Sequence, residues 1–512
     1  MAPTTSDHNV TETAFDAVKC KLSAVTLGYF EDPFLTHFVA KPTRRIPLIH
    51  RGYYLRHVAI SDCVNRFLDA SSDSPSVQIV SLGAGFDTLF FRLMQQHKTK
   101  LRFVEVDCEE IVRAKTEILR DSNRFATLLP LGVATESPSA AFECRVPSQA
   151  SEYTLVSCDL GDLSRLEVSL AAARIDFSMP TLIIAECVVS YLEPTRGSAL
   201  LEWLATRFHN ATAVMYDPVS LNDTFGQTQQ SYFAVKGCEL RGVRAFQTPY
   251  DHIQRLMRQC KWTSCRLVDM NTVFDVGTTR EEKRRIQSLE VFDEYADWVL
   301  CNAHYAMYIA VSRSQSSISA HWSDRFCEAH GTFASVVPSP GAPLLVRTFQ
   351  PQDLEAVQKL FQSTHLEYSC KAVKRFVQNR VRSGDLADVN AAFLVEPRSH
   401  FWVVESDAQE IIGCIGLKPR SASEGATDST LKTAELCRLS VHKNWRRRGV
   451  ASLLVNTLEQ FARVNRYNGI YLETIESMKS AQQFYAARGY EEAAQRVKFS
   501  TFTLVSFSKQ LA

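Results

Sequence analysis

Seven short apolar runs, separated by stretches with helical periodicity, constrain the fold of the first 310 residues more than any other feature. Strands that alternate with amphipathic helices predict a doubly wound, Rossmann-like α/β fold with a seven-stranded sheet. Ligands of such sheets bind beyond the carboxyl ends of the strands, so the residues that close each run are the first candidates for a site. The runs are Val77–Leu82, Leu101–Asp107, Tyr153–Leu160, Thr181–Ser190, Ala211–Val219, Trp262–Met270 and His304–Ser312.

A serine-rich segment, residues 312–343, interrupts this pattern and ends in VVPSPGAP. Enrichment in Ser, Pro and Gly between two periodic regions is typical of a linker. The sequence therefore predicts one domain over residues 1–311, a linker over 312–343 and a second domain over 344–512. A second polar stretch, Ser421–Thr430, is expected to be a surface loop.

Charge and hydropathy exclude several kinds of partner. Lys plus Arg number 57 and Asp plus Glu number 56, so the net charge of +1 gives no general attraction to nucleic acid or to an anionic membrane. No run approaches the ~20 apolar residues of a membrane span. The first residues, MAPTTSDHNV, lack the features of a signal peptide. We therefore expect a cytoplasmic protein that binds neither membrane nor nucleic acid.

The cysteines point to reduced thiols. The chain has 14 Cys and no CxxC pair, and most lie in apolar runs. Cys301 and His304 have a spacing found in metal sites, but no second pair accompanies them. No metal site is expected.

A glycine motif follows the first apolar run, in QIVSLGAGFDT. Gly83 and Gly85 permit a tight turn and a close approach of the backbone to a ligand. The third glycine of a dinucleotide fingerprint is replaced by Thr88, which disfavours a pyrophosphate ligand. A nucleoside without phosphates fits better.

Acidic residues close or follow three further runs. Asp107 lies near the ~20-residue spacing at which a carboxylate reaches ribose hydroxyls. Asp159 closes the next run, and Glu186 lies inside an apolar strand, where an acid needs a partner or a ligand. Any one acid could be a helix cap or a solvated turn. Together with the glycine motif they indicate S-adenosylmethionine.

Several longer motifs carry a resemblance to a known family. They are CKLSAVTLGYFEDPF, HRGYYLR, SLGAGFDTLFFRL, FVEVD, PTLIIAECVVSYLEP, FGQ, VDM and SLEVFDE. Across about residues 15–310 the sequence resembles the leucine carboxyl methyltransferase family. The resemblance implies methyl esterification of the C-terminal leucine of the type 2A protein phosphatase catalytic subunit, with S-adenosylmethionine as the methyl donor.

The resemblance also implies roles for individual residues. Lys21 and Arg51 would hold the carboxylate of the cofactor, Asp107 its ribose, and Asp159 and Leu160 its adenine. Gly83 would lie beside the cofactor, and Glu186 would face its methionine end. The family usually has Arg before FGQ, where this sequence has Thr224.

The expected chemistry needs no strong base, because a carboxylate acceptor is already ionised at pH 7. The enzyme must align the acceptor with the methyl group and keep water out. Tyr191 could orient the acceptor through its hydroxyl, although a packed aromatic at a strand end explains it equally well.

The region after residue 344 contains a basic glycine loop, RRRGVA, between a strand-like and a helix-like segment. A glycine turn followed by a helix start forms a phosphate cradle of backbone N–H groups. A nuclear localisation signal or a nucleic-acid patch are the alternatives.

Across about residues 344–508 this region resembles the GNAT acetyltransferase superfamily through RRRGVA and AQQFYAARGY. The resemblance implies acetyl-CoA binding by the loop and by the strand before it, and it leaves the amine acceptor unknown. Tyr485 would protonate the departing thiolate, and Glu435 could act as base or be an ordinary strand acid. The residues implied for acetyl-CoA are Leu439, Val441, Arg446, Arg448, Gly449 and Ala451.

Two alternatives stay open at this point. The methyl acceptor could be another small or peptide carboxylate. The GNAT domain could be a non-catalytic module that binds acetyl-CoA.

Overall fold

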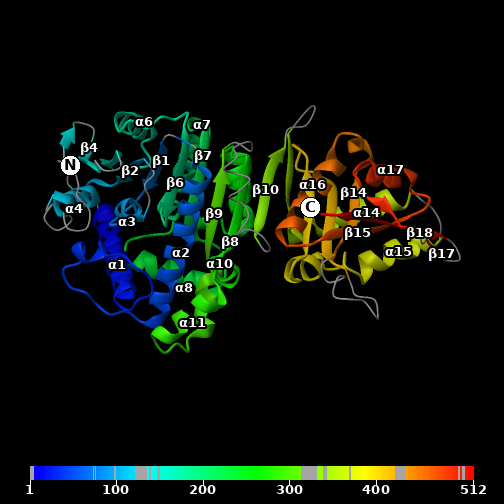
Figure 1. Cartoon of the computed structure of the whole chain (residues 1–512), viewed down its shortest axis with the longest axis horizontal. Helices are drawn as coiled ribbons and strands as arrows, with labels where there is room; N and C mark the ends of the chain where they lie inside the picture. Colours follow the sequence, from blue (N-terminus) through cyan, green and yellow to red (C-terminus); the bar gives the residue numbers. More distant parts are fainter. Residues whose placement is uncertain are drawn as a thin grey trace. The chain divides into compact units, whose positions relative to one another are not determined.

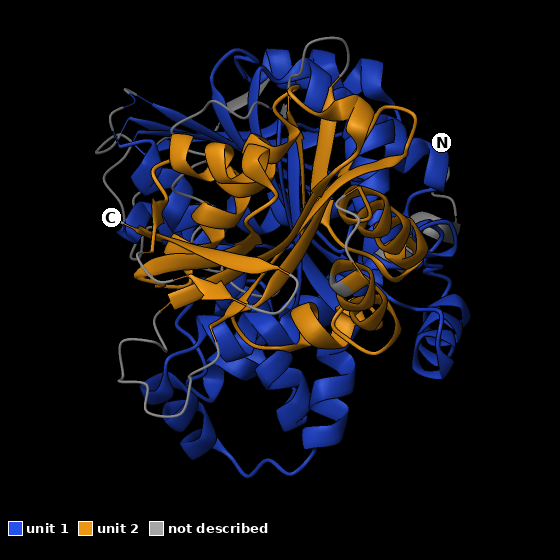
Figure 2. Cartoon of the chain, turned by 90° about the vertical axis from the view of Figure 1, so that its right-hand side faces the viewer, with its two compact units in different colours: residues 1–326 blue, residues 327–512 orange. Residues whose placement is uncertain are grey.

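The computed structural model divides the chain into two compact units, residues 1–326 and 327–512, which Figure 2 shows in blue and orange. We call them the first and the second unit. The structure describes residues 5–72, 74, 76–96, 100–120, 135–137, 140–146, 150–312, 331–337, 343–367, 371–420, 433–493, 496–498 and 502–511. The predicted surface loop Ser421–Thr430 lies outside these residues.

The sheet of the first unit has a parallel centre and antiparallel edges. Its central strands are β1 (Val77–Leu82), β2 (Leu101–Asp107), β5 (Ser151–Ser157), β6 (Pro180–Glu186) and β7 (Asn210–Pro218). They run in the order β5-β2-β1-β6-β7 with parallel pairing throughout. Beyond β7, β9 (Tyr305–Val311) and β8 (Ser264–Asp269) pair antiparallel. The expected doubly wound α/β fold is confirmed.

Each of the seven predicted runs contains one of these strands, but the sheet extends beyond seven. β3 (Thr135–Ser137) and β4 (Ala140–Val146) continue it, with β4 antiparallel to β5. In β4, buried Phe142, Cys144 and Val146 alternate with more exposed residues. A search for continuous apolar runs misses such an edge strand, because only one of its faces is buried.

Helices cover both faces of this sheet (Figure 1). Near β7, α7 and the short segment η5 (Arg255–Gln259) line one face beside Met215, while α2 contacts the other through Arg56 and Tyr216. The helices of the first unit are α1 (Thr5–Thr26), α2 (Pro47–Ala70), α3 (Leu89–Gln96), α4 (Glu109–Arg120), α6 (Leu163–Ala172), α7 (Pro194–Arg207), α8 (Thr224–Val235), α9 (Pro249–Gln254), α10 (Met270–Gly277), α11 (Arg280–Leu289) and α12 (Tyr295–Ala303).

The second unit is built on a mainly antiparallel sheet in the order β10-β11-β12-β13-β14-β15-β18. Among the described strands of this unit, β14 and β15 are the parallel pair, because helix α16 (Val450–Val464) connects them. The strands are β10 (Thr332–Val337), β11 (Leu344–Thr348), β12 (His400–Glu405), β13 (Ile411–Pro419), β14 (Thr433–Val441), β15 (Gly469–Ile475) and β18 (Thr503–Gln510), with short β16 (Glu491–Glu492) and β17 (Val497–Lys498) beside β18.

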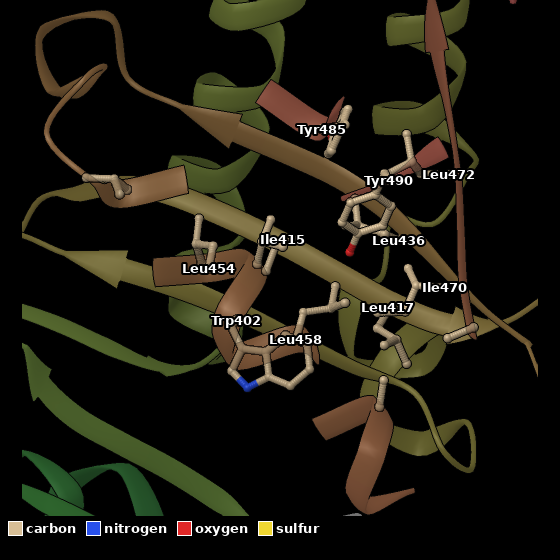
Figure 3. Packing of buried hydrophobic residues seen from close by; sticks show 14 of the residues in the cluster. Trp402, Ile415, Leu417, Leu436, Leu454, Leu458, Ile470, Leu472, Tyr485 and Tyr490 are labelled. Atoms are coloured by element: carbon tan, nitrogen blue, oxygen red, sulfur yellow. The ribbon is translucent and has the colours of Figure 1, made fainter. Parts of the chain in front are cut away.

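The helices of this unit are α14 (Leu354–His365), α15 (Lys371–Arg382), α16 (Val450–Val464) and α17 (Lys479–Ala487). Leu454 and Leu458 of α16 pack against Trp402, Ile415 and Leu436 of the sheet, forming the core shown in Figure 3. On the core of the other face, Phe361 of α14 and Val377 of α15 join Phe401 and Cys437.

The expected linker does not hold over its whole length. Thr332–Val337 form β10, which pairs with β11 through Ala334↔Arg347 to Val337↔Leu344. The segment Thr-Phe-Ala-Ser-Val-Val has the β-branched and aromatic residues of a strand, and the neighbouring Ser and Pro residues obscured it. Residues 313–330 and 338–342 of the expected linker lie outside the described residues.

Candidate functional site

The glycine motif forms the turn that follows β1. Gly83 and Gly85 have φ of 59° and 55°, in the left-handed region that glycine adopts without strain. A Cβ on Gly83 would also lie 2.6 Å from Cγ2 of Val188. Both glycines are therefore required by the backbone of this turn, at the carboxyl edge where ligands of such sheets bind.

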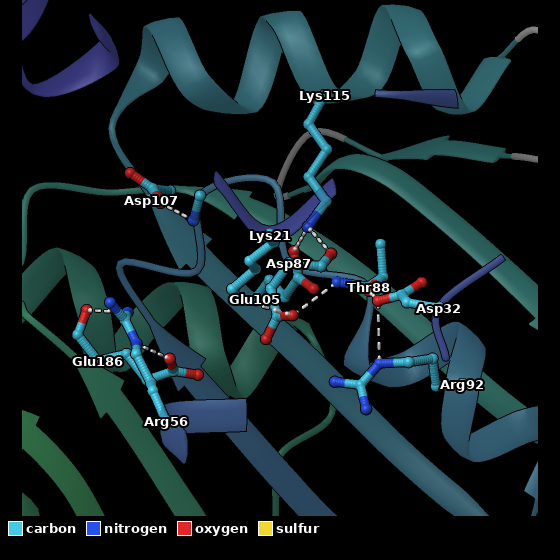
Figure 4. A network of polar contacts seen from close by, with 11 residues as sticks. Lys21, Asp32, Arg56, Asp87, Thr88, Arg92, Glu105, Asp107, Lys115 and Glu186 are labelled. Carbon is cyan, nitrogen blue, oxygen red and sulfur yellow. Dashed lines mark hydrogen bonds and ion pairs between the residues drawn. The ribbon is translucent and has the colours of Figure 1, made fainter. Parts of the chain in front are cut away.

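Asp107 closes β2 and supports the turn. Its carboxylate accepts hydrogen bonds from the backbone N–H of Gly85 and of Cys108, both at 2.7 Å. Burial raises the pKa of Asp107, and the two backbone donors oppose that shift. The side chain thus fixes the glycine turn at the end of β1 (Figure 4).

A buried network of charges lies beside the turn and includes Lys21 of α1. Lys21 Nζ lies 3.5 Å from a carboxylate oxygen of Asp87, and Lys115 Nζ donates to the backbone carbonyl of the same residue at 2.7 Å. Burial alone would raise the pKa of Asp87, but Lys21, Arg92 and Lys115 hold it well below its usual range. Figure 4 shows Lys115, Asp87 and Lys21 close together. Asp87 follows the glycine motif directly and was not among the sequence-based candidates.

Glu186, the last residue of β6, pairs with Arg56 of α2. Arg56 Nε donates to Glu186 at 2.5 Å, and the two side chains are 15% and 13% exposed. Burial alone would lower the pKa of Arg56, but the neighbouring Cys187 and Glu186 raise it well above its usual range. This nearly buried ion pair stands at the carboxyl edge of the sheet.

Arg51, which the resemblance implies for the cofactor carboxylate, packs on an aromatic ring, and its Nε and Nη2 are buried without a hydrogen-bond partner among the described residues. Its guanidinium lies over the ring of Phe292, 3.7 Å from the centroid. Residues five apart in a helix point about 140° apart around its axis, so Arg51 and Arg56 face different directions. Both arginines belong to the motif HRGYYLR, and only the packing of α2 shows which one meets Glu186.

The backbone after Glu186 is strained. Cys187 has φ of 55°, a conformation rare for residues other than glycine, and its N–H donates to the carbonyl of Tyr216 at 2.6 Å. Such outliers concentrate at functional sites. Burial raises the pKa of the Cys187 thiol to about 12, so it stays protonated at neutral pH.

Asp159 and Leu160 follow β5. The Asp159 carboxylate accepts from the Gly161 N–H at 2.8 Å and from Arg196 at 3.0 Å, and its side chain is 63% exposed. Leu160 is buried. Asp159 is thus oriented by a turn and an exposed ion pair at the same edge of the sheet.

A group of tyrosines surrounds Arg56 and was missed in the sequence. Tyr216 and Tyr305 stack with centroids 5.2 Å apart and planes at 9°, and Arg56 lies 4.9 Å from the Tyr216 centroid. Burial raises the pKa of Tyr53, Tyr216 and Tyr305, so their hydroxyls remain protonated. Tyr53 belongs to the motif HRGYYLR, but Tyr216 and Tyr305 belong to none, so sequence alone did not show that the three meet.

Tyr191, expected to orient the acceptor, lies in the short helical turn Val189–Tyr191 that follows β6. It contacts Phe233 edge to face, with centroids 6.3 Å apart, next to the small apolar cluster of Leu221, Leu240 and Val243. Burial raises its pKa well above the usual value. It can act as a hydrogen-bond donor but not as a base.

Cys301 and His304 do not form a metal site. His304 Nε2 lies 3.1 Å from both carboxylate oxygens of Asp223, and its Nδ1 lies 2.7 Å from the Leu300 carbonyl. Within the described part of the chain, no group of three or more His, Cys, Asp or Glu side chains could hold a metal ion. The described cysteines are free thiols.

In the second unit, the basic glycine loop forms a turn at the start of α16. Arg447 and Gly449 have φ of 61° and 86°, and Gly449 is the N-cap of the helix. Left-handed residues in a tight turn direct backbone N–H groups into one concavity, and the helix start adds its unpaired N–H groups. No atom lies within 4 Å of a Cβ built on Gly449, so the approach to this turn is open.

Two arginine side chains of the loop already contact other protein groups. Arg446 donates to Glu367 at 2.9 and 3.1 Å and to the Val441 carbonyl at 3.2 Å. Arg448 lies over Trp445, 5.2 Å from its centroid. The backbone of the loop therefore offers more for anion binding than Arg446 does.

The strand before the loop separates from its neighbour. The pairing of β14 with β15 ends at Glu435↔Tyr471, while β14 continues to Val441. β13 still pairs with β14 here, through Gly413↔Val441, but on the opposite side of β14 no described strand pairs with the segment of Leu439 and Val441. Tyr485 is buried with Tyr490 and Phe507, and burial raises its pKa above the usual value.

Glu435 lies at the point of separation. Its carboxylate is 3.7 Å from Lys418 Nζ, and its side chain is 29% exposed. Glu435 therefore faces partly into solvent, beside a cation.

The two sites define a class I methyltransferase unit followed by a GNAT acetyltransferase unit. Residues 9–205 match the family described as leucine carboxyl methyltransferase, and residues 359–490 match the acetyltransferase (GNAT) family. The chain belongs to the leucine carboxyl methyltransferase family and carries an additional GNAT domain. The expected cofactors, S-adenosylmethionine and acetyl-CoA, are confirmed as those of the two families.

Named relatives resemble the first unit. The leucine carboxyl methyltransferase 1 homolog of Arabidopsis thaliana is 34% identical over 297 residues, which cover 58% of this chain and 87% of that protein. The human tRNA wybutosine-synthesizing protein 4 is 37% identical over 301 residues, which cover 58% of this chain and 43% of the human protein. The match thus spans less than half of the human relative.

A solved GNAT-family acetyltransferase from Staphylococcus aureus Mu50 aligns with 33% of this chain and 99% of its own, at 18% identity and a TM-score of 0.27.

Among the described helices, none is both long and apolar enough to cross a membrane.

Proposed function

We propose that the first unit methyl-esterifies the C-terminal leucine carboxylate of the type 2A protein phosphatase catalytic subunit. The observation that carries this proposal is the Arg56–Glu186 pair at the carboxyl edge, surrounded by protonated tyrosines. Hydroxyl donors beside a guanidinium that would hold the cofactor suit a carboxylate acceptor, and none of these groups needs to remove a proton. The relatives named leucine carboxyl methyltransferase 1 favour leucine as the acceptor.

S-adenosylmethionine supplies an electrophilic methyl group when it is bound. The residues proposed to hold it are Lys21, Arg56, Gly83, Asp107, Asp159, Leu160 and Glu186, with Arg56 in the role first expected of Arg51. The glycine turn and the buried carboxylate that supports it fit a nucleoside, because glycines let the backbone approach a ligand closely and Asp107 holds the turn in place.

The protein's own residues orient the acceptor and keep protons in place. Burial holds the hydroxyls of Tyr53, Tyr191, Tyr216 and Tyr305 in their protonated form, so each can donate to an anionic oxygen. Tyr191 is proposed to donate to the acceptor carboxylate. Alignment and exclusion of water then lower the barrier.

The test uses a radiolabelled methyl donor, the full-length protein, and the phosphatase catalytic subunit with and without its last leucine. We expect label only on the subunit that retains the leucine. Label on both forms would show that another group accepts the methyl.

An alternative candidate for the methyl acceptor is a carboxylate on tRNA. The observation that favours it is the 37% identity to the human protein named for wybutosine synthesis. Adding tRNA to the same assay distinguishes the two acceptors, since label on tRNA alone would replace the phosphatase proposal by this one.

For the second unit, we propose acetyl transfer from acetyl-CoA to an amine. Leu439 and Val441 would pair with the pantetheine arm, and Arg446, Arg448, Gly449 and Ala451 would form the pyrophosphate loop. Burial keeps Tyr485 protonated, as protonation of the departing thiolate requires, and Glu435 would accept the proton of the amine. The alternative is a module that binds acetyl-CoA without catalysis.

One variant distinguishes an acetyltransferase from a module that only binds acetyl-CoA. Tyr485→Phe should leave acetyl-CoA affinity within about threefold and lower acetyl transfer by ~100–10,000-fold, the usual range for a general acid. An amine panel scored by free thiol release provides the assay. Tight binding of acetyl-CoA, with no release of the coenzyme A thiol in the presence of any amine of the panel, would favour the non-catalytic module.

A further inference from the structure

Gln229 of α8 presents an unused hydrogen-bond acceptor beside the tyrosines of the first unit. Its side-chain Nε2 donates to the Tyr305 hydroxyl oxygen at 2.7 Å. Its Oε1 is buried and has no hydrogen-bond partner among the described residues. A buried carbonyl without a donor is costly, so such a group is expected to meet a ligand.

Tyr305 brings this amide to the edge of the sheet where Glu186 lies. Tyr305 begins β9 and pairs with Pro218 at the end of β7, and two residues earlier in β7 Tyr216 pairs with Glu186 of β6. The rings of Tyr305 and Tyr216 are stacked, and Arg56 contacts Tyr216. Gln229, Tyr305 and the Arg56–Glu186 pair are therefore parts of one site.

The two side chains present complementary groups. Because Tyr305 accepts from Gln229, its own O–H proton stays free to donate. The pair thus offers one donor, the Tyr305 hydroxyl, beside one acceptor, Gln229 Oε1. A carboxylate with an N–H on the adjacent carbon matches this arrangement, since the carboxylate accepts and the N–H donates.

We propose that Gln229 and Tyr305 select acceptors that carry an N–H on the carbon adjacent to the carboxylate, as the C-terminal residue of a polypeptide does. Tyr305 donates to the carboxylate, and Gln229 accepts from the N–H. This inference rests on the proposed function and makes Gln229 a specificity-determining residue. A plain carboxylic acid would leave Gln229 Oε1 buried without a donor.

The experiment compares two forms of the phosphatase catalytic subunit in methyl transfer by the full-length protein. One form has its natural last amide bond, and the other is semisynthetic, with an ester oxygen in place of the final N–H. Wild type should prefer the amide form by about tenfold in kcat/KM, because the ester leaves the acceptor of Gln229 unmet.

Three variants sharpen the result. Gln229→Leu should bring the ratio of the two rates close to one, while Tyr305→Phe should slow both forms by a similar factor. Gln230→Leu is the matched control, because the Gln230 amide instead donates to the Leu221 carbonyl at 2.8 Å. Its ratio should equal that of wild type. Calorimetry with S-adenosylmethionine verifies that each variant still binds the methyl donor.

A wild-type ratio near one, or a ratio unchanged in Gln229→Leu, would overturn this inference and leave the proposed function intact. No methylation of either form would overturn both the proposed function and the inference. The two failures are therefore distinguishable.

Discussion

The candidate sites of the two units are built by different means. In the first unit, side chains far apart in the sequence meet at the sheet edge, such as Arg56 with Glu186 and Lys21 with Asp87. In the second unit, the candidate site consists mainly of backbone, at the turn of Gly449 and the strand edge after Glu435. A site made by local backbone is specified by one short motif, whereas a site made by distant side chains depends on packing.

The largest expected effect tests the backbone site. Gly449→Val should weaken acetyl-CoA binding by on the order of 100-fold, because a β-branched residue cannot adopt the left-handed turn without strain. Methyl transfer should not change. Titration calorimetry and a methylation assay on the same variant measure both quantities.

Normal acetyl-CoA binding by Gly449→Val would show that the cradle lies elsewhere. If the loop instead binds nucleic acid through charge, Gly449→Val should matter little and loss of Arg447 and Arg448 should matter most.

The side-chain site is tested by two arginines of one helix. Arg56→Lys should lower methyl transfer by ~10–100-fold, because Lys cannot reproduce the planar, directional contacts of a guanidinium with Glu186. Arg56→Lys should also raise the dissociation constant of S-adenosylmethionine more than Arg51→Lys does, since Arg51 packs on Phe292. The opposite ranking of the two dissociation constants would return the cofactor role to Arg51.

A smaller loss is expected at Asp107. Asp107→Ala removes the acceptor for the N–H groups of Gly85 and Cys108 and should weaken S-adenosylmethionine binding by ~1–3 kcal/mol. Asp107→Asn keeps one acceptor oxygen and is the matched control. Calorimetry that finds equal affinity for wild type and Asp107→Ala would remove Asp107 from the site.

Arg446→Ala should weaken acetyl-CoA binding only about threefold, because its guanidinium is occupied by Glu367 and the loop binds through backbone N–H groups. The same titration as for Gly449→Val measures it. A loss as large as that of Gly449→Val would mean that the arginine side chain carries the binding.

The smallest expected effect is that of pH on methyl transfer. Burial raises the pKa of the Cys187 thiol to about 12 and also raises the pKa values of Tyr53, Tyr216 and Tyr305. None of these groups therefore loses a proton between pH 6.5 and 9. The single-turnover rate should stay within about twofold across this range. A rate that rises tenfold per pH unit would reveal a general base.

The sequence was sufficient where local pattern and structure coincide. The run Val77–Leu82 became β1 and Leu101–Asp107 became β2, and the glycines predicted to turn after β1 have left-handed φ. The loop and helix around Gly449 were also predicted, because glycine placement before an apolar helix is a local signal.

The sequence was insufficient where packing decides. Strand β4 alternates buried and exposed residues instead of forming an apolar run, and β10 is surrounded by Ser and Pro. The choice between Arg51 and Arg56 depends on how α2 packs, and the meeting of Gln229 with Tyr305 depends on contacts across 76 positions. No spacing rule encodes such pairs.

The central claim is that the first unit forms a methyl ester on a C-terminal carboxylate. Methyl esters are hydrolysed by alkali, whereas methyl groups on nitrogen are not. After reaction with a tritiated methyl donor, the phosphatase catalytic subunit should carry label that alkali releases as volatile methanol, and a subunit lacking its last leucine should carry none. Alkali-stable label, or label on tRNA with none on the phosphatase, would contradict the account.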